Sequence, residues 1–237
     1  MSNAPQLSLL ASLPPPPLVS QLDAVAWLRT LRPESVDLIV TDPAYESLEK
    51  HRAVGTTTRL KAAWFDIFPN SRFPELFAEM YRVLKPNTHC YVMCDSETAF
   101  AIKPMGEAAG FKFWKPLVFD KVSIGMGYHY RARYEFVLFF EKGSRQLNDL
   151  GVPDVLEFKR VRDGYPTEKP VELCEVLVTQ SSEAGDLVAD PFMGSGSCGV
   201  AALKNGRRFA GTDISDAAVK LSSERLAAAG NTVSGGG

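Results

Sequence analysis

The stretch DLVADPFMGSGSCGVAALKNGRRFAGTDIS, residues 186–215, decides the fold. An apolar strand ends at Asp190, a turn rich in glycine follows, and a helix then leads to a second strand that ends at Asp213. Glycine lets the backbone approach a ligand closely, and the start of a helix presents unpaired amide groups. An acid that ends the next strand can bind the hydroxyls of a ribose. The stretch therefore predicts a nucleotide-type site where two parallel strands end.

The glycine spacing alone, GxGxxG at Gly194, Gly196 and Gly199, also fits a tight turn in which glycine serves only packing. The acid at Asp213 favours a ligand site over that interpretation. Too few residues follow Asp213 to supply the remaining strands, so these strands must come earlier in the chain. This arrangement predicts a circularly permuted order and argues against an ordinary nicotinamide dehydrogenase.

Upstream of this stretch, apolar runs of strand length alternate with helical patterns, which is typical of an α/β fold. We expect a mostly parallel, twisted sheet with helices on both faces. The predicted strands are residues 36–42, 88–95, 111–120, 134–141, 186–190 and 207–213.

Proline and glycine mark the expected ends of elements. A helix is predicted from Phe73, with Pro74 in its first turn and Pro86 just past its end. Ser215 can cap a last helix that stops at Gly230. The expected organisation is a flexible arm over residues 1–18, a single domain over 19–230 and a disordered tail over 231–237.

The composition is that of a soluble globular protein: 237 residues, 45% hydrophobic and 23% charged. A net charge of −2 argues against non-specific coating of nucleic acid, although a local basic groove remains compatible with it. We find no apolar run that could span a bilayer and no secretory signal, so we expect a cytoplasmic protein. The four cysteines form no zinc pattern, and no metal is expected; Cys90 and Cys94 are assigned to the core, and Cys198 to packing.

A second stretch, SVDLIVTDPAYESLEK at residues 35–50, brings Asp42, Pro43, Ala44 and Tyr45 to the carboxyl edge of the sheet. An isolated Asp-Pro turn with a tyrosine over the core is often only structural. Because the same chain also carries the glycine turn, we favour a catalytic role for residues 42–45 over a purely structural one. The Asp42 carboxylate and the Pro43 carbonyl can accept both hydrogens of an exocyclic amine. Tyr45 would stack on the base, which must first rotate out of a helix.

In these motifs the chain resembles the amino-methylating DNA methyltransferases of the permuted beta class, which use S-adenosylmethionine. The family's catalytic motif, D/N/S-P-P-Y/F/W, corresponds to residues 42–45, with Ala44 in place of the second proline. Its cofactor loop, DPFxGSG, corresponds to residues 190–196, and its ribose-binding acid to Asp213. The resemblance covers about residues 20–228 and implies a circularly permuted Rossmann-like methyltransferase fold.

Three further segments extend the resemblance. YPTEKP, residues 165–170, is similar to the family's HPTxKP with Tyr165 in place of histidine, and residues 22–42 resemble the segment whose acid lies near the adenine of the cofactor. Residues 113–143 resemble a region with the pattern W-x-K, GMG, R and E. The implied cofactor contacts are Asp23, Ala24, Asp42, Thr167, Lys169, Asp190, Pro191, Phe192, Met193, Gly194, Ser195, Gly196, Asp213 and Ile214.

Two segments, about 46–72 and 121–164, are expected to contact DNA. The first follows the catalytic turn and carries cations that can hold phosphates, whereas the second mixes aromatic residues with cations. For each single residue, a solvated loop or packing is an equally good interpretation. The candidate contacts are Lys50, His51, Arg52, Arg59, Lys61, Tyr128, His129, Tyr130, Arg131 and Arg133.

The target-recognition region that the family places at residues 142–164 is short here. Three explanations stay open: relaxed specificity, a share of the reading taken by the loop after Tyr45, or a second subunit. Members of this class often pair, so the resemblance leaves a homodimer open.

The resemblance implies that the chain transfers a methyl group from S-adenosylmethionine to the N6 amine of a flipped adenine in DNA. The transfer would be direct and in line, without a metal or a covalent enzyme intermediate. Aspartate at position 42 is, in the family, more typical of adenine than of cytosine methylation. The alternatives are N4 methylation of cytosine, an RNA substrate, or a catalytically silent nucleic-acid-binding regulator in which Ala44 marks decay.

Overall fold

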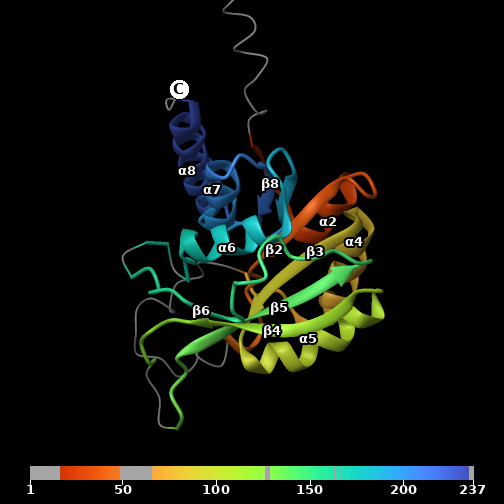
Figure 1. Ribbon diagram of the computed structural model, residues 1–237, viewed down its shortest axis with the longest axis vertical. Coiled ribbons are helices and arrows are strands. Elements are labelled where there is room, and N and C mark those ends of the chain that lie inside the picture. Colours follow the sequence, from red (N-terminus) through yellow and green to blue (C-terminus); the bar gives the residue numbers. More distant parts are fainter. Residues whose placement is uncertain (1–16, 49–65, 126–128, 163, 166, 235–237) are drawn as a thin grey trace, which may run out of the picture.

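The computed structural model describes residues 17–48, 66–125, 129–162, 164–165 and 167–234, with side chains as far as residue 230. These ranges form one eight-stranded sheet in the order β1-β8-β7-β2-β3-β5-β4-β6, with helices on both of its faces (Figure 1). The predicted α/β class is thereby confirmed. None of the helices in this part of the chain is long and apolar enough to cross a membrane.

The elements follow one another along the chain with strands and helices interleaved, as the apolar pattern predicts. They are β1 (Leu18–Gln21), α2 (Ala24–Thr30), β2 (Val36–Thr41), η2 (Asn70–Arg72), α4 (Phe73–Val83), β3 (Leu84–Cys94), α5 (Ser96–Ala108), β4 (Lys112–Asp120), β5 (Tyr134–Lys142), β6 (Val155–Glu157), α6 (Val171–Ser181), β7 (Leu187–Asp190), α7 (Ser197–Lys204), β8 (Arg208–Asp213) and α8 (Asp216–Ser234).

Strand direction positions the site. Every neighbouring pair of strands is parallel except β3 with β5 and β4 with β5, so β5 alone runs against the others. The carboxyl ends of the remaining strands therefore lie along one edge of the sheet, and β5 begins at that same edge. In open α/β sheets, ligands bind outside the carboxyl ends of the strands.

Side chains of the central strands alternate between two apolar layers because successive residues of a strand face opposite sides. Ile39 packs in the layer that α2, α4 and α5 cover. Leu38 and Val40 pack in the other layer, under α6, α7 and α8. β2 is buried along its whole length, as expected for a central strand covered on both faces.

The structure differs from the sequence-based expectations at several ends. β1 begins at Leu18, inside the predicted arm, and adds an edge strand beside β8. Pro86 lies just past the end of α4, as predicted, but β3 begins at Leu84 rather than at residue 88, so Pro86 lies within this strand, where the register against β2 shifts. The expected end of the last helix at Gly230 is wrong, because α8 continues to Ser234.

One glycine of the GxGxxG pattern serves packing. A Cβ atom at Gly199 would lie 2.6 Å from Cδ2 of Leu226 in α8 and 2.7 Å from Cε1 of Phe209 in β8. Gly199 thus allows α7 to lie close to its two neighbours. Gly196, in contrast, has a φ of +79° at the start of α7, a left-handed conformation that suits glycine.

We predict that Gly199→Ala and Gly230→Ala change stability in opposite directions. The first overpacks the core and should lower the free energy of unfolding by about 1–3 kcal/mol. The second faces open space in α8 and should raise it by about 0.5–1 kcal/mol, because alanine is the better helix former. Urea unfolding of both variants measures this. A loss of stability in Gly230→Ala would contradict a helix that continues past that residue.

Candidate active site

The site forms where β2 and β7 end side by side. The two strands pair in parallel, Leu38 with Val188 and Ile39 with Ala189, so Asp42 and Asp190 meet at one edge of the sheet. The buried hydroxyl of Thr41 donates a hydrogen bond of 2.8 Å to Oδ1 of Asp190, which ties the two turns together.

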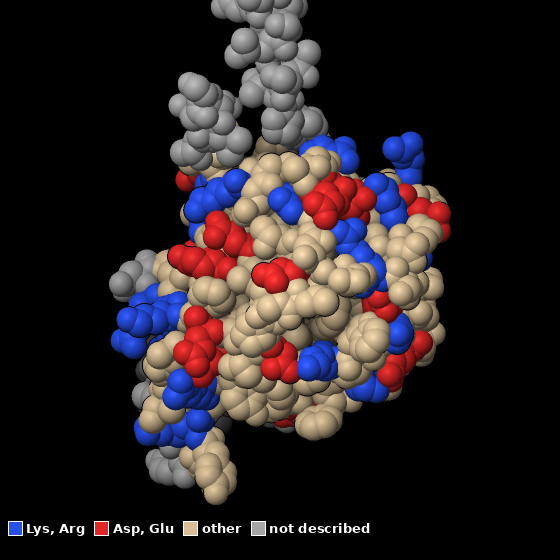
Figure 2. Space-filling model, in the orientation of Figure 1, with Lys and Arg blue, Asp and Glu red and all other residues tan. Residues whose placement is uncertain are grey.

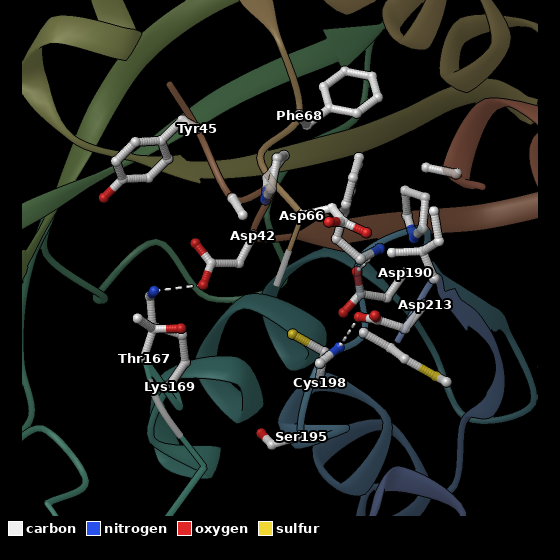
Figure 3. Close-up of a pocket in the computed structure, with 18 of the residues that line it drawn as sticks. Asp42, Tyr45, Asp66, Phe68, Thr167, Lys169, Asp190, Ser195, Cys198 and Asp213 are labelled. Atoms are coloured by element: carbon white, nitrogen blue, oxygen red, sulfur yellow. Dashed lines mark hydrogen bonds and ion pairs between the residues drawn. The ribbon is translucent and has the colours of Figure 1, made fainter. Parts of the chain in front are cut away.

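A single cavity gathers the predicted residues of both turns (Figure 3). The predicted residues that line it are Asp23, Ala24, Asp42, Pro43, Ala44, Tyr45, Thr167, Lys169, Asp190, Pro191, Phe192, Met193, Gly194, Ser195, Asp213 and Ile214. Gly196 is the one predicted cofactor contact that does not line it. The sequence analysis missed Asp66, Phe68, Arg72 and Glu135, which line it as well.

The catalytic turn is held by Phe68 in place of a second proline. The Ala44 carbonyl accepts a 2.7 Å hydrogen bond from the Phe68 amide, and Tyr45 forms a parallel bridge with Phe68. The Phe68 ring in turn packs edge-on against Phe73 and Phe192, with ring centroids 5.2 and 5.0 Å apart. The turn is therefore anchored in the core although proline is absent at position 44.

Asp42 is engaged by a buried lysine. Nζ of Lys169 lies 2.5 Å from Oδ2 of Asp42 and 3.2 Å from Oε2 of Glu135. Burial opposes the charge of Lys169, but the two carboxylates hold its pKa well above its usual value. Burial raises the pKa of Asp42 against the effect of Lys169. Glu135 reaches this edge because β5 is antiparallel and begins at Tyr134.

Asp213 is held by the glycine loop and by the turn that follows β8. The two carboxylate oxygens of Asp213 accept hydrogen bonds from the amides of Gly194 at 3.0 Å and Ser215 at 2.9 Å. Burial raises the pKa of Asp213. Tyr165, the residue that replaces the family's histidine, lines the cavity beside this loop. Thr167 lines it with a φ of 61°, which is a strained conformation for a β-branched residue and is typical of functional sites.

Asp23 is fixed at the opposite wall. Its carboxylate caps α2 by accepting hydrogen bonds from the amides of Val25 and Ala26, and it forms a two-pronged ion pair with Arg72 at 2.7 and 2.9 Å. The hydrogen bonds from Arg72 lower the pKa of Asp23. Arg72 follows a segment without an apolar period, so no sequence signal placed it in the site.

More acidic than basic side chains line the cavity, and this lining suits a cationic ligand. Burial raises the pKa of Asp190 to about 7, and the neighbouring carboxylates of Asp42 and Asp213 contribute to this shift. A bound cation would relieve this repulsion. The charged residues of its lining are Asp23, Asp42, Asp66, Arg72, Glu135, Glu168, Lys169, Asp190 and Asp213.

Of the four cysteines, only Cys198 lines the cavity, and it is also buried in the apolar core. Sγ of Cys198 lies 3.1 Å from Sγ of Cys174, and contact with that thiol together with burial raises the pKa of Cys198 well above its usual value. The expected packing role of Cys198 is thereby supported, and Cys90 and Cys94 lie in the core as predicted. Within the described ranges, no three His, Cys, Asp or Glu residues are grouped in a way that could hold a metal ion.

The predicted DNA contacts are only partly described. Lys50, His51, Arg52, Arg59, Lys61 and Tyr128 lie outside the described residues, whereas His129, Tyr130, Arg131 and Arg133 are exposed between β4 and β5. Arg133 forms an ion pair of 2.7 Å with Asp120 at the end of β4.

A second basic segment lies beside this one. β6 pairs in parallel with β4, Glu157 opposite Asp120, so the chain leaves both strands at the same point. Lys159 and Arg160 follow β6, and neither forms an ion pair with any residue whose position is described. Figure 2 shows Lys and Arg gathered on this flank of the molecule. We call residues 129–133 together with 159–160 the basic flank; the sequence analysis did not single out its second part.

We predict that Asp190→Asn removes a pH dependence of stability. Because burial raises the pKa of Asp190 from 3.8 to about 7, its contribution to stability is full below pH 3.8 and is lost as the pH rises to about 7. Asparagine keeps an oxygen that accepts the hydrogen bonds of Thr41 and Phe192. The unfolding free energy of the wild type minus that of the variant should fall by roughly 4 kcal/mol at most across this range. Denaturant unfolding between pH 4 and 8 measures it, and a difference that stays constant would contradict the raised pKa.

Comparison with known proteins places the site in a family. The chain matches a family described as DNA methylase over residues 36–224, which include the catalytic turn and the glycine loop. It is similar to the DNA adenine methyltransferase YhdJ of Escherichia coli (strain K12), with 29% identity over 243 residues, or 86% of this chain and 80% of the relative.

Two solved structures share the fold. One is the M1.HpyAVI–SAM complex, with a TM-score of 0.68, 22% identity and coverage of 88% of this chain and 98% of that one. The other is the PvuII DNA methyltransferase (cytosine-N4-specific), with a TM-score of 0.71, 16% identity and coverage of 95% and 96%. Because the family match extends over most of the chain and includes both parts of the site, the protein belongs to the DNA methylase family of N6 and N4 methyltransferases.

Proposed function

We propose that the chain methylates the N6 amine of adenine in DNA, with S-adenosylmethionine as the methyl donor. The observation that carries the proposal is the meeting of Asp42, Pro43 and Tyr45 with an acid-lined glycine loop in one cavity. The name of the relative YhdJ, a DNA adenine methyltransferase, supports adenine as the base.

The chain's own residues fit this donor. S-adenosylmethionine supplies a methyl group on a positively charged sulfur, and the excess of carboxylates in the cavity suits that charge. The loop from Asp190 to Gly196 would hold the methionine end, Asp213 the ribose hydroxyls and Asp23 the adenine end. The raised pKa of Asp190 fits this placement, because a cation beside it would stabilise the ionised carboxylate.

The catalytic turn would orient the target amine. Among the described residues, Oδ1 of Asp42 accepts no hydrogen bond, so it can accept one hydrogen of the amine while the Pro43 carbonyl accepts the other. Tyr45 would support the flipped base from the side. The amine nitrogen gains the methyl group and releases one proton to water. Most of the rate would come from position and orientation, and from the Asp42 charge beside the developing positive charge.

N4 methylation of cytosine is the second candidate function. The PvuII methyltransferase, named as cytosine-N4-specific, has the same fold as this chain. Cytosine also presents an exocyclic amine next to a ring nitrogen, so the turn at Asp42 offers both bases the same two acceptors. Only the identity of the methylated base distinguishes the two functions.

Transfer of labelled methyl groups to unmethylated DNA, followed by nucleoside analysis, tests the proposal. We expect N6-methyladenine from the wild type and a rate at least about 100-fold lower from Asp42→Ala, because the variant loses an oriented acceptor and its charge. Calorimetry of cofactor binding shows whether the variant is still folded and loaded. Labelled N4-methylcytosine would support the second candidate, and no transfer from a folded protein that binds the cofactor would contradict both and point to RNA or a silent regulator.

The basic flank would hold the phosphates of the DNA beside the cavity. We predict that Lys159→Gln with Arg160→Gln raises KM for DNA several-fold and leaves kcat unchanged. The slope of log affinity against log salt should shrink by about 2, since each phosphate contact contributes about 0.9.

A matched control removes one arginine and one lysine at positions outside the basic flank. Arg32 precedes the amino end of β2, and Lys103 lies in α5, where it pairs with Glu107. Arg32→Gln with Lys103→Gln should leave KM and the salt slope as in the wild type. Equal effects of the two double variants would show that only net charge matters.

A further inference from the structure

We propose that Lys169 and Glu135 are positioning residues that hold Asp42 by its Oδ2 oxygen and leave Oδ1 to receive the target amine. This inference rests on the proposed function, because it assigns each oxygen of the catalytic carboxylate a separate task. The sequence analysis assigned Lys169 to the cofactor and assigned Glu135 no role.

The first support is the position of the Lys169 ammonium. It lies between two carboxylates, 2.5 Å from Oδ2 of Asp42 and 3.2 Å from Oε2 of Glu135, and its side chain is only 11% exposed. Figure 3 shows Lys169 and Asp42 pointing toward one another, with the second oxygen of Asp42 directed away from the ammonium. A buried ammonium needs such partners, so this contact persists in the folded protein.

The second support is the way in which Glu135 is held. The antiparallel pairing of β5 with β4 continues to the start of β5, where Glu135 lies opposite Phe119, whereas the pairing with β3 ends at Phe136. Nζ of Lys121 lies 3.2 Å from Oε1 of Glu135, whereas Lys169 contacts the other oxygen, Oε2. Oε2 is buried and has no hydrogen-bond partner among the described residues, so its ion pair with Lys169 is its sole polar contact there. Glu135 is therefore fixed by the sheet and by Lys121, and it fixes Lys169 in turn.

The third support is the fixed start of the segment that carries Lys169. Pro170 follows directly and is the N-cap of α6, whose Leu173, Cys174 and Leu177 are buried against the sheet. The lysine therefore extends from a rigid helix start. Three separately held elements, β2, β5 and the start of α6, converge on one carboxylate.

We call the contacts of Lys169 with Asp42 and Glu135 the clamp. The clamp has two consequences for methyl transfer. It stops the Asp42 carboxylate from rotating, so one oxygen faces the amine in a constant direction. It also places a positive charge beside a carboxylate that burial would otherwise protonate, and the ionised carboxylate is the stronger acceptor for the hydrogen of the amine and carries the charge that stabilises the developing positive charge. The titratable groups that act on Asp42 or sense its charge are Lys169, Glu135, Tyr45, Asp190, Cys94 and Cys198.

The test is the pH profile of kcat for methyl transfer to DNA by the full-length chain. In Lys169→Gln, the acid limb should move up by about 1–3 pH units, because an opposite charge at this distance shifts a carboxyl by that amount. A residue with a merely structural role would lower the amount of active protein and leave the position of the limb unchanged.

A second variant, Glu135→Gln, distinguishes the positioning of Lys169 from the effect of charge on Asp42. The amide keeps the shape of the side chain, loses the ion pair with Lys169 and removes a negative charge near Asp42. We expect a kcat plateau that is lower by about tenfold, as for a small misplacement of a catalytic group, while the acid limb does not move up. The matched control is Lys103→Gln, which breaks a lysine–carboxylate contact of 2.7 Å on exposed α5 and should change neither quantity.

The outcomes are distinguishable from failure of the proposed function. A wild type that transfers no methyl group would contradict that function, whereas an active wild type with an unmoved acid limb in folded Lys169→Gln would overturn the clamp. If Lys169→Gln does not fold, the Glu135→Gln variant tests the proposal instead. A kcat plateau equal to that of the wild type would then overturn it. Thermal unfolding and calorimetry of cofactor binding establish that each variant is folded and loaded.

Discussion

The hydrogen bond from Thr41 to Asp190 joins residues 149 positions apart and holds the two halves of the site at one place. It exists because β2 and β7 run parallel as neighbours, so the catalytic turn and the glycine loop leave the sheet together. Both partners are almost completely buried, and an unpaired carboxyl there would be costly. The predicted turn at residues 42–45 and the glycine loop therefore face each other across one cavity.

Much of the fold and of the site could be predicted because the relevant signals are local. A strand, a glycine turn, a helix and a terminal acid within residues 186–215 identify the loop, and the motif at residues 42–45 identifies the turn. The parallel sheet then brings the two together. β6 escaped prediction because, with three residues, it is shorter than the pattern that distinguishes a strand from a loop. β1 escaped because it directly follows the four prolines on which the predicted arm was based.

Glu135 escaped for a different reason. Its sequence context, one acid at the start of an apolar strand, is common to many solvated strand ends. The family pattern over residues 113–143 contains this acid but gives it no role, and its place in the cavity depends on the reversed direction of β5, which is a property of pairing over long distances. Lys159 and Arg160 are a similar case: only the pairing of β6 with β4 places them beside residues 129–133. Local patterns in a single sequence therefore do not predict which residues the strand order brings together.

The pairing that fixes Glu135, together with Lys121 just after β4, makes its position independent of the residues between Lys121 and Tyr134. β5 is registered against β3 over seven residue pairs, from Thr88 with Lys142 to Cys94 with Phe136, and against β4 on its other side. Insertions or deletions in residues 122–132 would therefore change the surface that we propose for DNA contact without moving the Glu135 carboxylate. The same holds for the segment after β6. If these two segments contact DNA as proposed, a lineage of such enzymes can acquire new target sequences by remodelling them while the contacts around Asp42 are inherited unchanged.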